Sequence, residues 1–250
     1  MTERQRAILK ALIEAFISSG EDVSSFELLR NNEFEVSSAT LRNEFLSLTE
    51  SGYLTKSHFA SGRIPTIKGL YFYINNLMHE EQVNFLEAVR IGQELYNERF
   101  DIQTLLRQSM KTVHKLTGEP VFVIYNNVIQ FYRISRLLSA YTHFPKKIQS
   151  DYLKGLITFW DVIEDPEVFS SILGSQVEYP RGGVGLFSGT ELGLEELENF
   201  IAVFAPFKLL QSDTSHGYIG TIGYINLNYR SVVPTLKTMA DMLNNMLKGW

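Results

Sequence analysis

The chain has 250 residues, of which 44% are hydrophobic and 20% are charged, and its formal net charge is −5 at pH 7. This composition is typical of a folded globular protein and excludes disordered and collagen-like chains. No apolar run reaches the roughly 18 residues that cross a bilayer, and the opening residues have no signal-peptide core. We therefore expect a cytoplasmic protein with no membrane partner.

The charges are unevenly distributed along the chain. Between Glu50 and Glu80 there is no acidic residue, whereas Lys56, Arg63 and Lys68 lie inside that window. A net charge for the whole chain can hide a local basic patch, so the negative total does not exclude a nucleic-acid partner. A solvated surface without function would carry the same charges, and the neighbouring pattern has to decide between the two.

Three helices are predicted in the first 50 residues. Thr2 and Gln5 form a capping box ahead of a wide apolar stripe that stops at Gly20. Serines at 24–25 and 37–38 offer the N-caps of a short second helix and of a third.

The third helix has two different faces. Leu41, Phe45 and Leu48 recur at helical spacing and are expected to face a core. Small side chains let a helix enter the major groove, and Asn, Arg, Thr and Ser can hydrogen-bond base edges or phosphates. The face predicted to point outward is small and polar and consists of Ala39, Thr40, Asn43 and Ser47, flanked by Arg42 and Leu46.

A hairpin is predicted after the third helix. Residues 53–57 alternate as a strand, and a loop containing Gly62 leads to 64–66. Helix, helix, helix, hairpin is the order of a winged helix, and Gly62 would let the hairpin tip approach a DNA backbone closely. A purely structural bundle would have the same order, but the basic wing and the polar helix favour a DNA-binding domain over residues 1–75. The predicted DNA-binding residues are Ser38, Thr40, Arg42, Asn43, Ser47, Lys56, Arg63 and Lys68.

One long motif carries a family resemblance. The stretch SSATLRNEFLSLTESGYLTKSHFASGRIPTIKGLYFYI resembles the N-terminal domain of the heat-inducible transcription repressors of the HrcA family, and segments 217–223 and 229–233 resemble its C-terminal strand and helix more loosely. The resemblance implies a dimeric repressor that binds an inverted-repeat operator on double-stranded DNA upstream of chaperone genes. It also implies that a GroEL-type chaperonin maintains the active form. The domain that the family inserts after the first hairpin of its sheet is missing or shortened here.

The remaining residues predict a helical linker over 76–100 and an α+β domain over 101–250. Asn126 and Asn127 tolerate positive φ and mark a hairpin. An antiparallel sheet with helices on one face follows, which the resemblance makes a GAF-like regulatory and dimerisation domain. Strands are expected at 120–125, 128–134, 176–179, 200–204, 207–211 and 218–227, and helices at 148–160 and 167–173.

The last helix is predicted to form a homodimer. Its apolar residues recur at spacings of 4, 3, 4 and 3, a period of 3.5 residues that is typical of a helix–helix seam. A helix that only covers its own sheet would have the same pattern. Two DNA-binding heads would suit an inverted repeat. The predicted seam consists of Val232, Leu236, Met239, Leu243 and Met246.

Nothing in the sequence indicates catalysis. The glycine-rich segment 183–189 has no preceding strand and no helix start to hold a phosphate, so a surface loop is predicted there. Glu195, Glu196 and Glu198 point apart on one short helix, and the five histidines are never three or four residues apart. Without cysteine, disulfides, thiol nucleophiles and cysteine zinc sites are also excluded. We expect no enzyme, no catalytic residue, no metal and no cofactor.

Two other functions remain open. One is a ligand-sensing winged-helix regulator whose C-terminal domain binds a metabolite, for which His216 is a candidate lining residue, although a loop histidine without a ligand fits it better. The other is an adaptor that uses the winged helix to dock a protein. Ligand sensing predicts an effector that shifts DNA affinity, and an adaptor predicts no salt-sensitive DNA binding.

Overall fold

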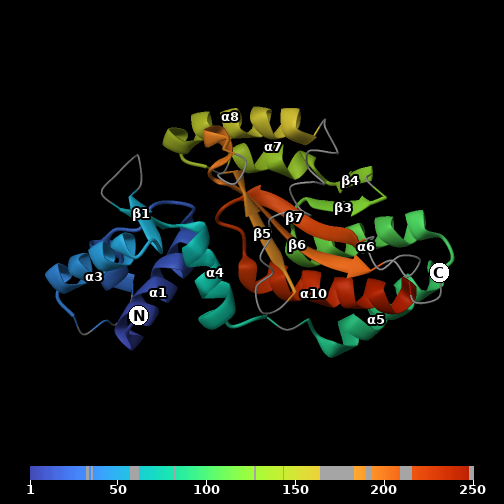
Figure 1. Ribbon diagram of the computed structural model, residues 1–250, viewed down its shortest axis with the longest axis horizontal. Coiled ribbons are helices and arrows are strands. Elements are labelled where there is room, and N and C mark those ends of the chain that lie inside the picture. Colours follow the sequence, from blue (N-terminus) through green and yellow to red (C-terminus); the bar gives the residue numbers. More distant parts are fainter. Residues whose placement is uncertain are drawn as a thin grey trace. The chain divides into compact units, whose positions relative to one another are not determined.

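The computed structural model describes two compact units, residues 1–79 and 80–250 (Figure 1). The boundary at His79 falls inside the predicted linker, and most of that linker forms the first helix of the second unit. The residues described are 1–31, 34, 36–56, 62–81, 83–126, 128–142, 144–163, 183–189, 193–208 and 216–247.

Unit 1 has the predicted order of three helices and a hairpin, followed by a further helix. Thr2 and Gln5 form the expected capping box, and Gly20 ends the first helix with a positive φ of 69°. The sequence did not predict the fourth helix, although Thr66 caps it by accepting the backbone N–H of Gly69. The elements are α1 Glu3–Ser19, α2 Ser25–Asn31, α3 Ser38–Glu50, β1 Leu54–Lys56, β2 Arg63–Pro65 and α4 Ile67–Asn76.

Unit 2 is a five-stranded antiparallel sheet with the order β4-β3-β7-β6-β5 and helices on both faces (Figure 1). Helices α7 and α8 cover one face and α6 and α10 cover the other. The elements are α5 Phe85–Asn97, α6 Ile102–Thr117, β3 Val121–Tyr125, β4 Val128–Tyr132, α7 Ser135–Tyr141, α8 Lys146–Ile163, β5 Gly185–Ser188, η2 Glu195–Leu197, β6 Phe200–Lys208, β7 His216–Tyr224 and α10 Tyr229–Met246.

The prediction of helices on one face only is wrong. Consecutive residues of a strand point to opposite faces, and residues 121–124 of β3 are all buried. Phe122 and Ile124 pack with α7 and α8, so Val121 and Val123 point to the opposite face. An apolar sheet surface on both sides requires a helical layer on each.

Several strand boundaries also differ from the prediction. Asn126 has the positive φ expected of the hairpin turn, at 50°. Two strands were predicted at 200–204 and 207–211, whereas residues 200–208 form the single strand β6. Strand β5 pairs only with Ile201–Phe204, so the missing N–H of Pro206 costs no bond to that strand. Residues 185–188 form buried β5, where a surface loop was predicted. The strand predicted at 176–179 and the helix at 167–173 lie outside the described residues.

Helix α10 has a proline in its interior, and the freed carbonyl has another partner. Pro234 has no N–H to give to the carbonyl of Arg230 four residues earlier. The backbone N–H of Glu81 donates to that carbonyl instead, at 2.9 Å. Ion pairs from Lys237 to Glu80 and from Arg230 to Glu81 join the same two segments. The start of unit 2 is therefore tied to α10.

Candidate nucleic-acid interface

The orientation of α3 is fixed by its cap and its apolar side. Ser37 accepts the backbone N–H of Thr40 at 3.1 Å, which starts the helix. Leu41, Phe45 and Leu48 are 0%, 4% and 2% exposed, so the predicted core face of the helix is confirmed. The exposed residues of the opposite face are Ala39, Arg42, Asn43, Leu46 and Glu50.

This outer face is rotated slightly from the predicted one. Thr40 is half-buried with its hydroxyl 2.9 Å from that of Ser37, and Ser47 is half-buried and accepts a hydrogen bond from Gln5 Nε2 at 3.3 Å. Both hydroxyls therefore have partners inside unit 1, while Arg42 and Asn43 are exposed on either side of Ala39 and Leu46. Ser38, at the first turn, is half-buried as well.

Glu44 is a buried charge that sequence reasoning missed. It is 8% exposed and accepts a hydrogen bond from Arg4 Nε at 2.7 Å and one from Gln5 Nε2 at 3.1 Å. A buried carboxylate needs such partners, and these two tie α3 to the first turn of α1. The signal was present, because position 44 falls between Leu41 and Leu48 on the inward side of the helix.

The three predicted basic residues of the wing differ in their surroundings. Lys56 is exposed at the end of β1. Arg63, its cross-strand partner, donates from Nε to Thr49 Oγ1 at 3.2 Å and from a terminal nitrogen to the carbonyl of Gly62 at 3.1 Å. Arg63 thereby links the hairpin to α3.

Lys68 also has a structural contact. Its Nζ donates to the carbonyl of Ser51 at 2.8 Å and lies 4.7 Å from the ring centroid of Tyr53. The side chain therefore spans the junction between α3 and β1.

Gly62 is required by packing within unit 1. A Cβ at this residue would lie 2.2 Å from Asp22 Oδ2, and the Gly62 N–H donates to that oxygen at 3.1 Å. This contact is a second reason for glycine here, and the close approach to a DNA backbone stays a prediction. Residues 57–61, which would form the hairpin tip, lie outside the described part of the chain.

The residues of the predicted dimer seam on α10 are not on the surface of the single chain, so the prediction of a seam there is wrong. Val232, Leu236 and Leu243 are fully buried, Met239 is 2% exposed and Met246 is half-buried, all within a single chain. The helix packs on β6, β7 and α6 of its own unit. These side chains already have an apolar partner, so the 3.5-residue period reflects packing on the sheet.

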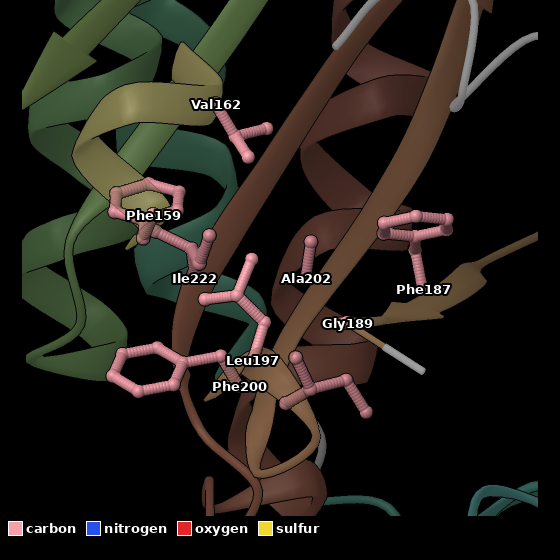
Figure 2. A pocket seen from close by; sticks show the side chains of 9 residues that line it. Phe159, Val162, Phe187, Gly189, Leu197, Phe200, Ala202 and Ile222 are labelled. Atoms are coloured by element: carbon pink, nitrogen blue, oxygen red, sulfur yellow. The ribbon is translucent and has the colours of Figure 1, made fainter. Parts of the chain in front are cut away.

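Unit 2 contains a small, partly open apolar hollow of about 20 Å³ between α8 and the β5 side of the sheet (Figure 2). Figure 2 shows Phe187 across the hollow from Phe159 and Phe200. Its lining side chains are all apolar, so they offer no hydrogen bond to orient a ligand. The lining residues are Phe159, Val162, Phe187, Gly189, Leu197, Phe200, Ile201, Ala202 and Ile222.

Within the described ranges, no helix is long and apolar enough to cross a membrane. Across the same residues, no cluster of three or more His, Asp or Glu side chains is arranged to hold a metal ion. The side chain of His216 is not among those described.

Fold comparison defines a class of mixed helix-and-sheet proteins built from antiparallel sheets. A crystal structure of a hypothetical protein has a TM-score of 0.64 at 17% identity, covering 100% of this chain and 99% of that one, which shows the fold alone. The Thermotoga maritima IclR has a TM-score of 0.32 at 17% identity over 98% of this chain and 97% of its own, too low to support an argument. No protein-family profile matches the sequence.

One curated relative is more specific. The chain is 37% identical over 117 residues to the heat-inducible transcription repressor HrcA of Acetivibrio thermocellus, and the match covers 47% of this chain and 33% of that repressor. The resemblance to the HrcA family inferred from the motif is therefore confirmed over those residues. The match spans about a third of the length of that relative, which is named a transcription repressor.

Proposed function

We propose that the chain is a DNA-binding transcription repressor of the HrcA type, in which unit 1 is a winged helix and α3 enters the major groove. The observation that carries this proposal is the exposed pair Arg42 and Asn43 on a helix whose opposite side is fixed in a core. Arg can bind guanine and Asn adenine with two hydrogen bonds, each worth roughly 1 to 3 kcal/mol of discrimination. Ser38, Thr40 and Ser47 border this face and are proposed to contact phosphates.

The basic residues of the hairpin have different proposed roles. Lys56, which is exposed, contacts a phosphate. Arg63 and Lys68 add positive potential while their side chains hold the hairpin against α3. No acidic residue between Glu50 and Glu80 offsets the charges of Lys56, Arg63 and Lys68, and Asp22, from outside this window, contacts it at Gly62.

Unit 2 is the proposed GAF-like regulatory and dimerisation domain. The similarity to HrcA supports a cytoplasmic homodimer that binds an inverted-repeat operator of chaperone genes, with a GroEL-type chaperonin as the partner that keeps it active. The alternative of a ligand-sensing regulator would place an apolar effector at the hollow in Figure 2, whose lining is apolar but whose volume of about 20 Å³ is that of about one water molecule.

Selection of bound sequences from a random DNA pool tests the proposal. The full chain should enrich an inverted repeat with half-sites about one helical turn, or a multiple of it, apart. Asn43→Ala should relax the preference at one position of each half-site, by roughly 1 to 3 kcal/mol, and leave non-specific binding nearly intact. Asn75→Ala, an equally conservative change of an exposed residue on α4, is the matched control.

The outcome separates the candidate functions. A folded Asn43→Ala protein that keeps the parental preference at every position would refute the role of α3. Binding that is absent or insensitive to salt would favour the protein-docking adaptor. An apolar compound that shifts DNA affinity or melting temperature would favour the ligand sensor.

A further inference from the structure

Helix α5 and the turn that follows it carry the densest group of exposed apolar side chains in the described residues. Of twelve large hydrophobic side chains with high exposure, five lie between residues 85 and 100. A single exposed apolar residue is ordinary, but a contiguous group marks an interaction surface. The five are Phe85 at 77%, Leu86 at 76%, Val89 at 44%, Tyr96 at 56% and Phe100 at 72% exposed.

These residues form one continuous surface next to a different, buried one. Phe85, Val89 and Tyr96 share a helical line with Gly92, where an added Cβ would meet no atom within 4 Å. Ile91 and Leu95 are 4% and 0% exposed, on the side of the helix that packs against α6. A helix that is apolar on two sides is normally covered on both. The outer surface, defined as Phe85, Leu86, Val89, Gly92, Tyr96 and Phe100, is called the α5 face.

We propose that the α5 face binds the α5 face of a second copy of this chain, with the two helices antiparallel about a two-fold axis near Gly92. Such a pairing uses the same patch on both copies. It sets Val89 near the partner's Tyr96 and Phe85 near the partner's Phe100. The open space at Gly92 lets the two backbones approach where they cross.

The area of the face fits this occupant. With the exposures above, its side chains offer on the order of 600 Å² of apolar surface per copy, close to the roughly 800 Å² per partner of a standard stable interface. The other exposed aliphatic side chains of unit 2's helices are Leu138, Leu153 and Ile157, which form a smaller set. The seam predicted on α10 is buried within one chain. Among the described helices of unit 2, α5 has the largest exposed apolar stripe, and the guanidinium of Arg99 lies 3.6 Å from the ring centroid of Tyr96 and 4.0 Å from that of Phe100 at its C-terminal end.

The place of α5 in the chain also suits a dimer with two DNA-binding heads, and this step rests on the proposed function. Five residues, 80–84, separate the end of unit 1 at His79 from the start of α5 at Phe85. Two antiparallel helices centred on Gly92 have their N-termini about 20 Å apart along the axis, at 1.5 Å per residue.

Sedimentation of the full chain at about 10 μM, where a micromolar interface is populated, tests the inference. The parental protein should sediment as twice 28.6 kDa. Val89→Glu and Tyr96→Glu place charges inside the face and should each weaken association at least 100-fold, without changing circular dichroism. Ile157→Glu, an exposed residue of α8 at 58%, is the matched control and should leave the dimer intact.

Each other result overturns the inference. A parental protein that is monomeric at this concentration would show that the α5 face does not bind a second copy. Another part of the same chain would then cover it. A dimer that survives both charged variants, or that Ile157→Glu dissociates, places the interface elsewhere. A monomer that still selects an operator half-site would refute the α5 surface and leave the proposed role of α3 standing. A dimer that both charged variants dissociate but that selects no DNA sequence would support the α5 face and refute the proposed role of α3.

Discussion

Helices α10 and α5 of unit 2 are both amphipathic, but they differ in how much of their apolar surface the chain itself covers. The apolar stripe of α10 packs on the sheet, with Val232, Leu236 and Leu243 fully buried. Helix α5 buries Ile91 and Leu95 and leaves a second stripe in solvent. The comparison teaches that a helical period shows only that a helix packs on something. A helix with one apolar side is covered by one packing partner, whereas a helix with two apolar sides needs a second.

The largest expected difference is in stability. Leu236→Ala should lower the free energy of unfolding of unit 2 by about 2 to 5 kcal/mol, because it leaves a cavity under α10. Val89→Ala, on the exposed side of α5, should change it by less than about 0.5 kcal/mol in the monomer. Urea unfolding followed by tryptophan fluorescence measures both, since Trp160 and Trp250 belong to unit 2. Equal losses would remove the distinction between the two helices.

The free energy of unfolding of unit 2 should also depend on pH, through Glu119. Burial raises the pKa of Glu119 from 4.5 to about 7, and the charge of Arg136 opposes the shift only in part. The folded chain then binds this proton more tightly than the unfolded chain. The stabilising contribution is complete below about pH 4.5 and is lost as the pH rises through 7, by about 2 to 3 kcal/mol.

Urea unfolding at a series of pH values checks this expectation. The Glu119→Gln variant should unfold with a free energy that changes less between pH 5 and pH 7.5 than that of the parental protein, beyond the ordinary range of about 0.5 kcal/mol for surface changes. A variant with the parental pH profile would show that another group titrates.

The smallest effect concerns Gly92. Nothing lies near an added Cβ at this residue, so Gly92→Ala should stabilise α5 by up to about 1 kcal/mol through higher helix propensity. Thermal unfolding at low protein concentration, where association is minimal, measures the change. A loss of stability would mean that the space at Gly92 is filled in the folded monomer. The α5 face would then have no open position at which a second helix could approach.

Local signals in the sequence were sufficient for several elements. The capping box of Thr2 and Gln5, the stop at Gly20 and the turn at Asn126 depend on residues a few positions apart, and all three are present. The inward side of α3 followed from spacing alone.

Contacts between distant residues account for what the sequence could not predict. Glu44 is buried because Arg4 and Gln5 of another helix reach it, and Gly62 is fixed by Asp22, 40 residues earlier. The partner of α10 was ambiguous because a sheet and a second helix demand the same stripe. The base contacts proposed for Arg42 and Asn43 depend on DNA and stay predictions.

Pro234 allows α10 to bind the backbone of the segment that follows unit 1. By leaving the carbonyl of Arg230 without a helical donor, it opens a place for the backbone of Glu81, which follows unit 1 by two residues. The helix that covers the sheet of unit 2 therefore also holds the residues that directly follow unit 1, through one backbone hydrogen bond and two ion pairs.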